Sequence, residues 1–150
     1  MDQDVADVSK IAVAHFAAGC NCAQSMLVSF AAELGLETQT AIRLATGFGV
    51  GMARGGVCGV VSGAVMVLGL AGGGGGPGGA ARKAATYART REFYDQFIDR
   101  HGSLICRDLI GLDPSVSEGL DQARREHRFE TVCVKLVSDA AAILEIMLHT

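Results

Sequence analysis

The feature that most constrains the fold is an apolar segment over residues 55–70 in which three of the glycines recur at every fourth position. These are Gly55, Gly59 and Gly63. On a helix they would lie along one side, where the missing side chains let a neighbouring backbone approach closely. A glycine-rich loop at 47–56 leads into this segment. We predict a central helix over about residues 57–70, with Cys58 in its first turn.

The other segments favour helices over strands, because apolar residues recur at helical spacing and alternating β-branched runs are rare. Asn21 and Gln24 form a capping-box pattern, which indicates a helix start at residue 22. Helices are predicted at about 4–18, 22–34, 38–46, 80–101, 103–110 and 129–148. The predicted buried face of the helix over 80–101 consists of Tyr87, Tyr94, Phe97 and Ile98.

The length of the chain fits a single domain. With 150 residues, of which 49% are hydrophobic, it can bury a core without disulfides. We predict an all-α fold, a compact bundle of six to eight helices around the central helix, over residues 1–150. The glycine-rich tract at 72–79 is predicted to be a flexible linker between two helices of that domain.

Charge and patterning argue against several classes of protein. The net charge of −3 and the scattered basic residues disfavour nucleic acid as a partner. The apolar stretch 57–71 is shorter than the roughly 20 residues of a membrane span, so no membrane insertion is expected. The acidic start of the chain lacks a secretory signal, which favours a cytoplasmic location. No histidine has a spacing typical of metal ligands; the four are His15, His101, His127 and His149.

Five cysteines in a reducing compartment are typical of metal binding, catalysis or buried packing rather than of a disulfide framework. Cys22 and Cys58 are each predicted in the first turn of a helix, where free N–H groups and the helix dipole lower the pKa of a thiol. Alternatively, a free cysteine packs as a small hydrophobe, and Cys133, on an apolar helical stripe, fits that role best. No CxxC pair and no ferredoxin-type cysteine run is present.

Four short motifs resemble those of a known family. Residues 19–24 (GCNCAQ) are similar to a GYNCAQ-like motif, and residues 58–63 (CGVVSG) to a CGAxxG motif. Residues 106–111 (CRDLIG) are similar to a CRxLxG-like stretch, and residues 133–135 (CVK), before an alanine-rich helix, to the segment of a fourth cysteine. The chain resembles, over nearly its whole length, the redox-active family named for its cysteine pattern, C_GCAxxG_C_C.

The resemblance implies a redox site built from four thiols. These are Cys22, Cys58, Cys106 and Cys133. Cys20 stands where the family has an aromatic residue, and it is therefore an additional thiol. Val60 replaces the alanine of the motif and narrows the space beside Cys58.

Two versions of the redox chemistry stay open. In the first, the four cysteines bind an iron–sulfur cluster or a single metal ion, zinc or iron. We favour this version because cysteines that converge from distant segments need something to hold them. In the second, the thiols form reversible disulfides, with Cys22 or Cys58 as the attacking thiolate. In both, Gly59 and Gly63 allow close approach, and Ser62 bonds either a sulfur or a carbonyl of its own helix.

The alternative from another class is a structural or partner-binding helical bundle, for example one associated with a transporter, whose buried cysteines are inert. A redox protein would in addition need a redox partner, which the sequence does not identify. The glycines of the central helix can pack within one chain or between two, so a homo-oligomer stays open. Enzymatic and electron-carrier roles are both compatible with the four thiols.

Overall fold

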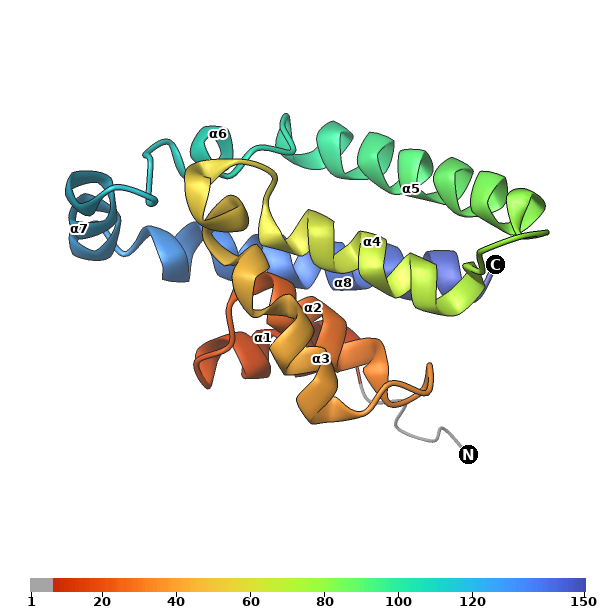
Figure 1. Ribbon diagram of the computed structural model, residues 1–150. Coiled ribbons are helices and arrows are strands. Elements are labelled where there is room, and N and C mark those ends of the chain that lie inside the picture. The colour runs from red at the N-terminus through yellow and green to blue at the C-terminus, as the bar shows by residue number, and fades with distance from the viewer. Residues whose placement is uncertain (1–6) are drawn as a thin grey trace.

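The computed structural model describes residues 7–150, which are mainly helical and contain one isolated bridge between extended residues. The eight α-helices of this range are α1 (Val8–Ala17), α2 (Cys22–Ala31), α3 (Thr38–Ala45), α4 (Gly59–Gly72), α5 (Ala80–His101), α6 (Cys106–Ile110), α7 (Ser117–Arg125) and α8 (Val134–Leu148). Three short turns accompany them: η1 (Thr46–Phe48), η2 (Gly51–Gly55) and η3 (Phe129–Cys133). The predicted all-α class and number of helices are confirmed (Figure 1).

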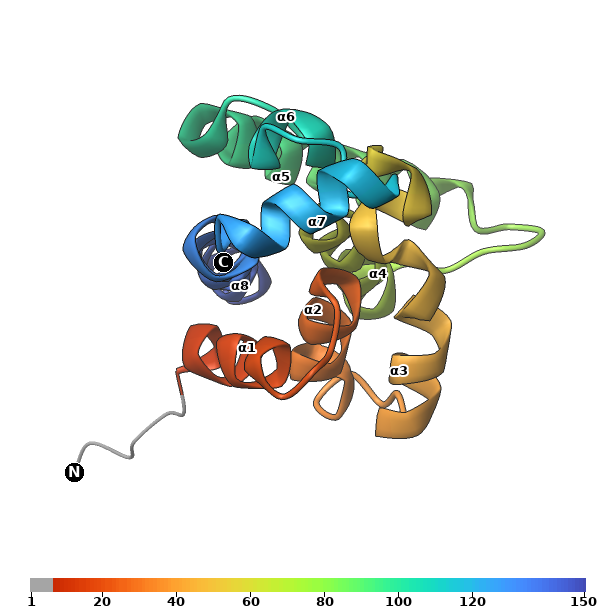
Figure 2. The same cartoon turned by 90° about the vertical axis from the view of Figure 1, so that its left-hand side faces the viewer.

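Two long helices form the axis of the bundle. α4 and α8 lie side by side, with α5 on one side of the pair and α1, α2 and α3 on the other (Figure 1). The short helices α6 and α7 lie at one end, which faces the viewer in Figure 2. The largest fully buried apolar side chains come from α2, α4, α5 and α8, and they are Met26, Leu27, Val60, Val61, Val67, Phe93, Phe97, Val137, Ile143 and Leu144.

The central helix α4 begins at Gly59, two residues later than predicted. Val57 pairs with Ile105 in the isolated antiparallel bridge, which keeps the chain extended at this point. Cys58 therefore has a non-helical ψ of 137° and occupies the cap position before α4 rather than its first turn.

Two of the three regularly spaced glycines bring α4 close to α2. A Cβ atom on Gly63 would lie 2.7 Å from Cβ of Met26, and one on Gly59 would lie 3.0 Å from Cβ of Cys22. Gly55 does not share this face, because it lies in η2 with a φ of 68°. The predicted alignment of all three glycines on one helix is therefore wrong at Gly55.

The predicted helix ends agree best with the structure where residues next to the end form the cap. The capping box is present, since Gln24 N–H donates to Asn21 Oδ1 (2.8 Å) and Asn21 N–H donates to Gln24 Oε1 (2.9 Å). α2 nevertheless ends at Ala31, three residues before the predicted end at 34. α1 ends at Ala17, and its predicted start at residue 4 lies outside the described residues.

The buried face of α5 differs from the prediction. Phe93 and Phe97 are fully buried, and their ring centroids lie 5.9 Å apart. Tyr94 is half-buried against the core, whereas Tyr87 and Ile98 are exposed. Residues four apart face the same side of a helix, so the Phe93–Phe97 pair sets which side of α5 faces the core.

The C-terminal third is less regular than predicted. Residues 103–105 are not helical, and Ser103 Oγ accepts a hydrogen bond from Ile105 N–H instead of capping α6. α7 (Ser117–Arg125) lies between the helices predicted at 103–110 and 129–148, where no helix was predicted. The last helix is preceded by a wide turn, in which Val134 N–H donates to the carbonyl of Phe129, five residues back.

The glycine tract joins α4 to α5 as residues 73–79, because Gly72 is still part of α4. Gly73 N–H donates to the carbonyl of Gly69 and closes the last turn of α4. Among residues 7–150, no helix combines the length and the apolar character needed to span a membrane.

Candidate four-cysteine site

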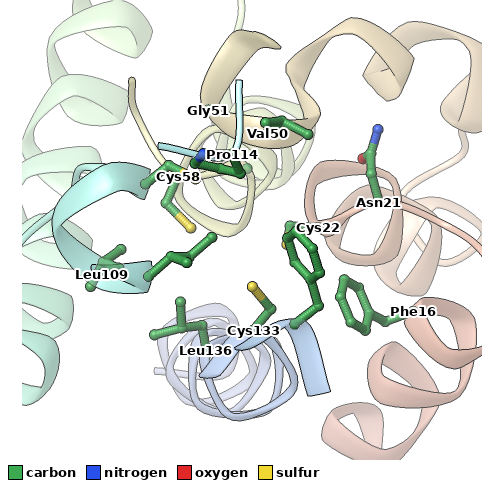
Figure 3. Close-up of a pocket in the computed structure, with 14 residues that line it drawn as sticks. Phe16, Asn21, Cys22, Val50, Gly51, Cys58, Leu109, Pro114, Cys133 and Leu136 are labelled. Carbon is green, nitrogen blue, oxygen red and sulfur yellow. The ribbon is translucent and has the colours of Figure 1, made fainter. Parts of the chain in front are cut away.

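A cavity of about 130 Å³ lies between the ends of α2, α4, α6 and α8. Its wall includes the four cysteines Cys22, Cys58, Cys106 and Cys133. Most of the remaining wall is apolar and consists of Phe16, Val50, Leu109, Ile110, Pro114, Phe129 and Leu136. Figure 3 shows this arrangement, with the sulfur of Cys133 directed into the space. Cysteines that are far apart in the sequence therefore share one small apolar cavity.

Cys22 is the first residue of α2, and the cap before it fixes its position. The Asn21 side chain donates through Nδ2 to the carbonyl of Thr46 (2.9 Å) and accepts from Gln24 N–H through Oδ1 (2.8 Å). On the other side, the bare Cα of Gly59 leaves the space that Cys22 occupies. The capping box and this glycine together determine how far Cys22 projects into the cavity.

Cys58 and Cys106 are brought together by the antiparallel bridge between Val57 and Ile105. The N–H of each cysteine donates to a carbonyl of the opposite segment, at 2.8 Å for Cys58 and 2.6 Å for Cys106. Cys58 follows Val57, and Cys106 follows Ile105. Because successive side chains of an extended chain point to opposite faces, the two cysteine side chains lie on the same face of the bridge, diagonally opposite each other.

Cys133 is the last residue of the wide turn η3, and Phe129, which begins that turn, also lines the cavity. Single wide turns of this kind recur in helices at functional sites. The four cysteines are thus positioned by the cap of α2, the bridge and the wide turn. Contacts within the protein therefore account for the position of each cysteine, and the convergence of the four thiols is not in itself an argument for a cofactor.

A left-handed turn over residues 50–55 forms another part of the wall. Val50, Met52 and Ala53 have φ values of 54°, 58° and 60°, a conformation that costs L residues roughly 1–2 kcal/mol each. Val50 and Gly51 line the cavity, and a Cβ atom on Gly51 would lie 2.8 Å from Cβ of Cys106. Neither residue was predicted to line the site, although the density of glycine at 47–56 indicates a tight turn beside Cys58.

Burial dominates the electrostatics of two of the thiols. It raises the pKa of Cys58 to about 12, although the N–H groups of Val60 and Val61 at the start of α4 act to lower it. Burial also raises the pKa of Cys106 to about 12, and the nearby Cys133 raises it further. The predicted lowering of the Cys58 pKa is therefore wrong. The helix start acts in the predicted direction, but the loss of hydration outweighs it.

Cys22 and Cys133 both line the cavity, and each affects the pKa of the other. Their hydrogen bond raises the pKa of Cys22 well above its usual value, and burial adds to the rise. The same hydrogen bond holds the pKa of Cys133 below its usual value, against the opposing effect of burial. The pKa of Cys22 is thus raised and not lowered as predicted, and Cys133 is the thiol of this pair that ionises more readily.

The other residues predicted to support the site are distributed unevenly. Gly59 lines the cavity, whereas Gly63 and Ser62 are absent from its wall. Ser62 Oγ donates to the carbonyl of Gly59 (3.3 Å), so this serine bonds within its own helix. Cys20 is half-buried in the connection before α2 and does not line the cavity.

The arrangement of the cysteines bears on whether the site could bind a metal. Within residues 7–150, no three His, Cys, Asp or Glu side chains converge tightly enough to hold a metal ion. Four cysteines around an apolar space nevertheless form a donor set of the kind that binds an iron–sulfur cluster, in which the cysteines can bind different irons.

The fold and the site define a class of protein, an all-α bundle with four cysteines around a cavity at one end. A family model described as "putative redox-active protein (C_GCAxxG_C_C)" matches residues 20–147, which is most of the chain. The chain belongs to this family. No curated protein and no solved structure matches it.

Proposed function

We propose that the protein is a thiol-based redox protein that cycles between the dithiol and disulfide forms of Cys22 and Cys133. The supporting observation is that the two side chains line the same small cavity, where a hydrogen bond between them raises the pKa of Cys22 and lowers that of Cys133. The thiolate is the form that attacks a disulfide, and a neighbouring thiol can resolve the mixed disulfide that results. The attacking role thus falls to Cys133 rather than to Cys22 or Cys58.

The chemistry is a two-electron exchange of sulfur–sulfur bonds. The Cys133 thiolate attacks one sulfur of a substrate disulfide, and the other substrate sulfur leaves as a thiolate. That thiolate takes the proton of Cys22, whose sulfur then attacks Sγ of Cys133 and displaces the second substrate sulfur. The substrate is reduced to thiols, the last of which takes its proton from solvent, and the protein holds a Cys22–Cys133 disulfide.

A second candidate is supported by the presence of Cys58 and Cys106 in the same cavity, because one dithiol pair does not require them. The four cysteines would hold an iron–sulfur cluster, which when bound would supply one-electron transfer. Buried thiols with raised pKa values ionise together only when positive charge offsets their repulsion, and the irons would provide that charge.

One experiment separates these candidates. Protein purified without oxygen is analysed for iron, then oxidised, blocked in acid and mapped by mass spectrometry. We expect a metal-free protein with a Cys22–Cys133 disulfide, which Cys133→Ser abolishes and the matched control Cys20→Ser leaves intact. Bound iron with visible absorbance would support the cluster instead. Metal-free thiols that all stay reduced would overturn both candidates and support the inert bundle.

A further inference from the structure

We infer that the cavity beside Cys133 is a binding site for a small, uncharged, apolar disulfide, of which a 1,2-dithiolane ring is the simplest form. This inference rests on the proposed dithiol–disulfide function and adds the class of substrate. It follows from the access to Cys133, the size of the cavity and the polarity of its wall.

Access limits the substrate to a small molecule. The exposed fraction of Cys133 is 3%, and those of Cys58 and Cys106 are 4% and 5%. A disulfide on the surface of a folded partner therefore cannot be brought in line with Cys133. The cavity is partly open to solvent, and half-buried side chains such as Leu109 and Phe129 form part of its wall. A small molecule can reach the sulfur by this route.

The size of the cavity matches one small ring. Its volume is about 130 Å³, and an apolar protein cavity of about 150 Å³ holds one molecule of benzene. A five-membered dithiolane ring is of similar size, and an attached chain would extend through the open side. A linear disulfide with two bulky arms would not fit in the same volume.

The apolar wall of the cavity disfavours charged substrates. None of the 14 residues that line the cavity carries a formal charge apart from the cysteines themselves. The amide of Asn21 is held in place by its bonds to Thr46 and Gln24, and it is uncharged, so it cannot neutralise a charged substrate. Burying a charge without a partner is strongly unfavourable. Glutathione disulfide, which carries several carboxylates and ammonium groups, is therefore disfavoured.

The wall also suits the reaction. Exchange of sulfur–sulfur bonds places the developing negative charge on sulfur, and it needs no donors aimed at an oxyanion. Sγ of Cys133 forms a bond to one ring sulfur, the ring S–S bond breaks, and the other ring sulfur leaves as a thiolate. This thiolate takes the proton of Cys22, whose sulfur bonds to Sγ of Cys133 and displaces the remaining ring sulfur. The ring becomes a dithiol after protonation by solvent, and the cysteine pair becomes a disulfide.

The test compares two disulfides on the reduced, full-length protein. The rate of Cys22–Cys133 closure is measured with lipoamide, which is uncharged and carries a dithiolane ring, and with glutathione disulfide. Each rate is divided by the rate for the same protein unfolded in urea, which removes the difference in intrinsic reactivity. We expect folding to favour lipoamide over glutathione disulfide by at least about tenfold, because only the charged disulfide loses hydration without compensation.

A variant of the cavity wall checks that the preference arises at this site. Leu109→Phe narrows the cavity, and it should lower the lipoamide rate at least about threefold while the unfolding midpoint shows that the protein is folded. The matched control Leu44→Phe changes an exposed leucine on α3, away from the cavity, and it should leave both rates unchanged.

The outcomes separate this inference from the proposed function. If folding changes the rates with lipoamide and with glutathione disulfide equally, or if it favours glutathione disulfide, the inference is overturned. Closure of the Cys22–Cys133 disulfide by hydrogen peroxide but by neither disulfide would overturn the inference and leave the proposed function standing. Failure of every oxidant to close this disulfide would overturn both.

Discussion

Replacing Gly63 by alanine should separate α4 from α2 and destabilise the protein. A Cβ atom at this position would lie 2.7 Å from Cβ of Met26, 3.0 Å from the carbonyl oxygen of Ala23 and 3.2 Å from its Cα. Both neighbours are fully buried, and two of the three atoms belong to the backbone of α2. The clash cannot be relieved by a change of rotamer, so one helix must move away from the other.

The free-energy cost of this clash can be separated from the effect of alanine on the helix by a control in the same helix. Adding a methyl group to a packed interior costs about 1–3 kcal/mol, whereas glycine to alanine in a helix gains about 1 kcal/mol. Gly69 is also in α4, and a Cβ atom there would meet no other heavy atom within 4 Å. Both variants gain the free energy of replacing glycine by alanine in a helix, but only Gly63→Ala introduces the clash with α2. We therefore expect Gly63→Ala to be less stable than Gly69→Ala by about 1–3 kcal/mol.

Urea unfolding followed by circular dichroism measures this difference. In thermal unfolding the same difference in free energy corresponds to a difference in Tm of roughly 3–10 °C for a chain of this size. The slope of free energy against urea should be the same for both variants if the native folds are the same. A Gly63→Ala protein as stable as Gly69→Ala would refute the close packing of α2 on α4.

Three further predictions concern the cysteine cavity. Because burial raises the pKa values of Cys58 and Cys106 to about 12, the folded state keeps their protons at a pH where the unfolded chain loses them. The free energy of unfolding should therefore fall between about pH 9 and 12, by about 1.4 kcal/mol per pH unit for each thiol. Urea unfolding of Cys58→Ala at several pH values should show a smaller decrease than the unmodified protein. Ala53→Gly should stabilise the fold by about 0.5–1 kcal/mol, because relief of the left-handed conformation exceeds the added chain entropy; a less stable variant in urea would contradict this. Cys22→Ala removes a hydrogen-bond donor and should raise the pKa of Cys133, which the pH dependence of iodoacetamide alkylation measures; an unchanged profile would count against the pair.

The sequence predicted those parts of the fold that neighbouring residues determine. The start of α2 follows from Asn21 and Gln24, which satisfy each other's backbone N–H groups with no help from distant residues. The bounds of α5 follow from the break at a glycine tract and from Gly102, whose φ of 83° ends the helix. Its buried face was predicted less well, because Phe93 and Tyr94 are both aromatic and only packing against the core decides between them.

The site was less predictable, because its properties depend on contacts between distant segments. A helix start can be recognised locally, but the loss of hydration that raises the pKa of Cys58 appears only when α6 and α8 close the cavity around it. The interaction of Cys22 with Cys133 likewise joins residues that are far apart in the sequence. The late start of α4 has the same kind of origin, since Val57 is held extended by Ile105.

The left-handed turn at 50–55 shows how strongly the cavity constrains the fold. Val50, Met52 and Ala53 together carry roughly 3–6 kcal/mol of unfavourable backbone conformation at about 1–2 kcal/mol each, which is a large part of the roughly 5–15 kcal/mol that stabilises a typical domain. A right-handed turn would relieve this energy, but it would move Gly51 from its close contact with Cys106 and Val50 from the cavity wall. Strain of this size persists only where the surrounding structure over-determines the backbone, and such positions cluster at functional sites. The turn is therefore better explained by the enclosure of the thiols than by the stability of the bundle.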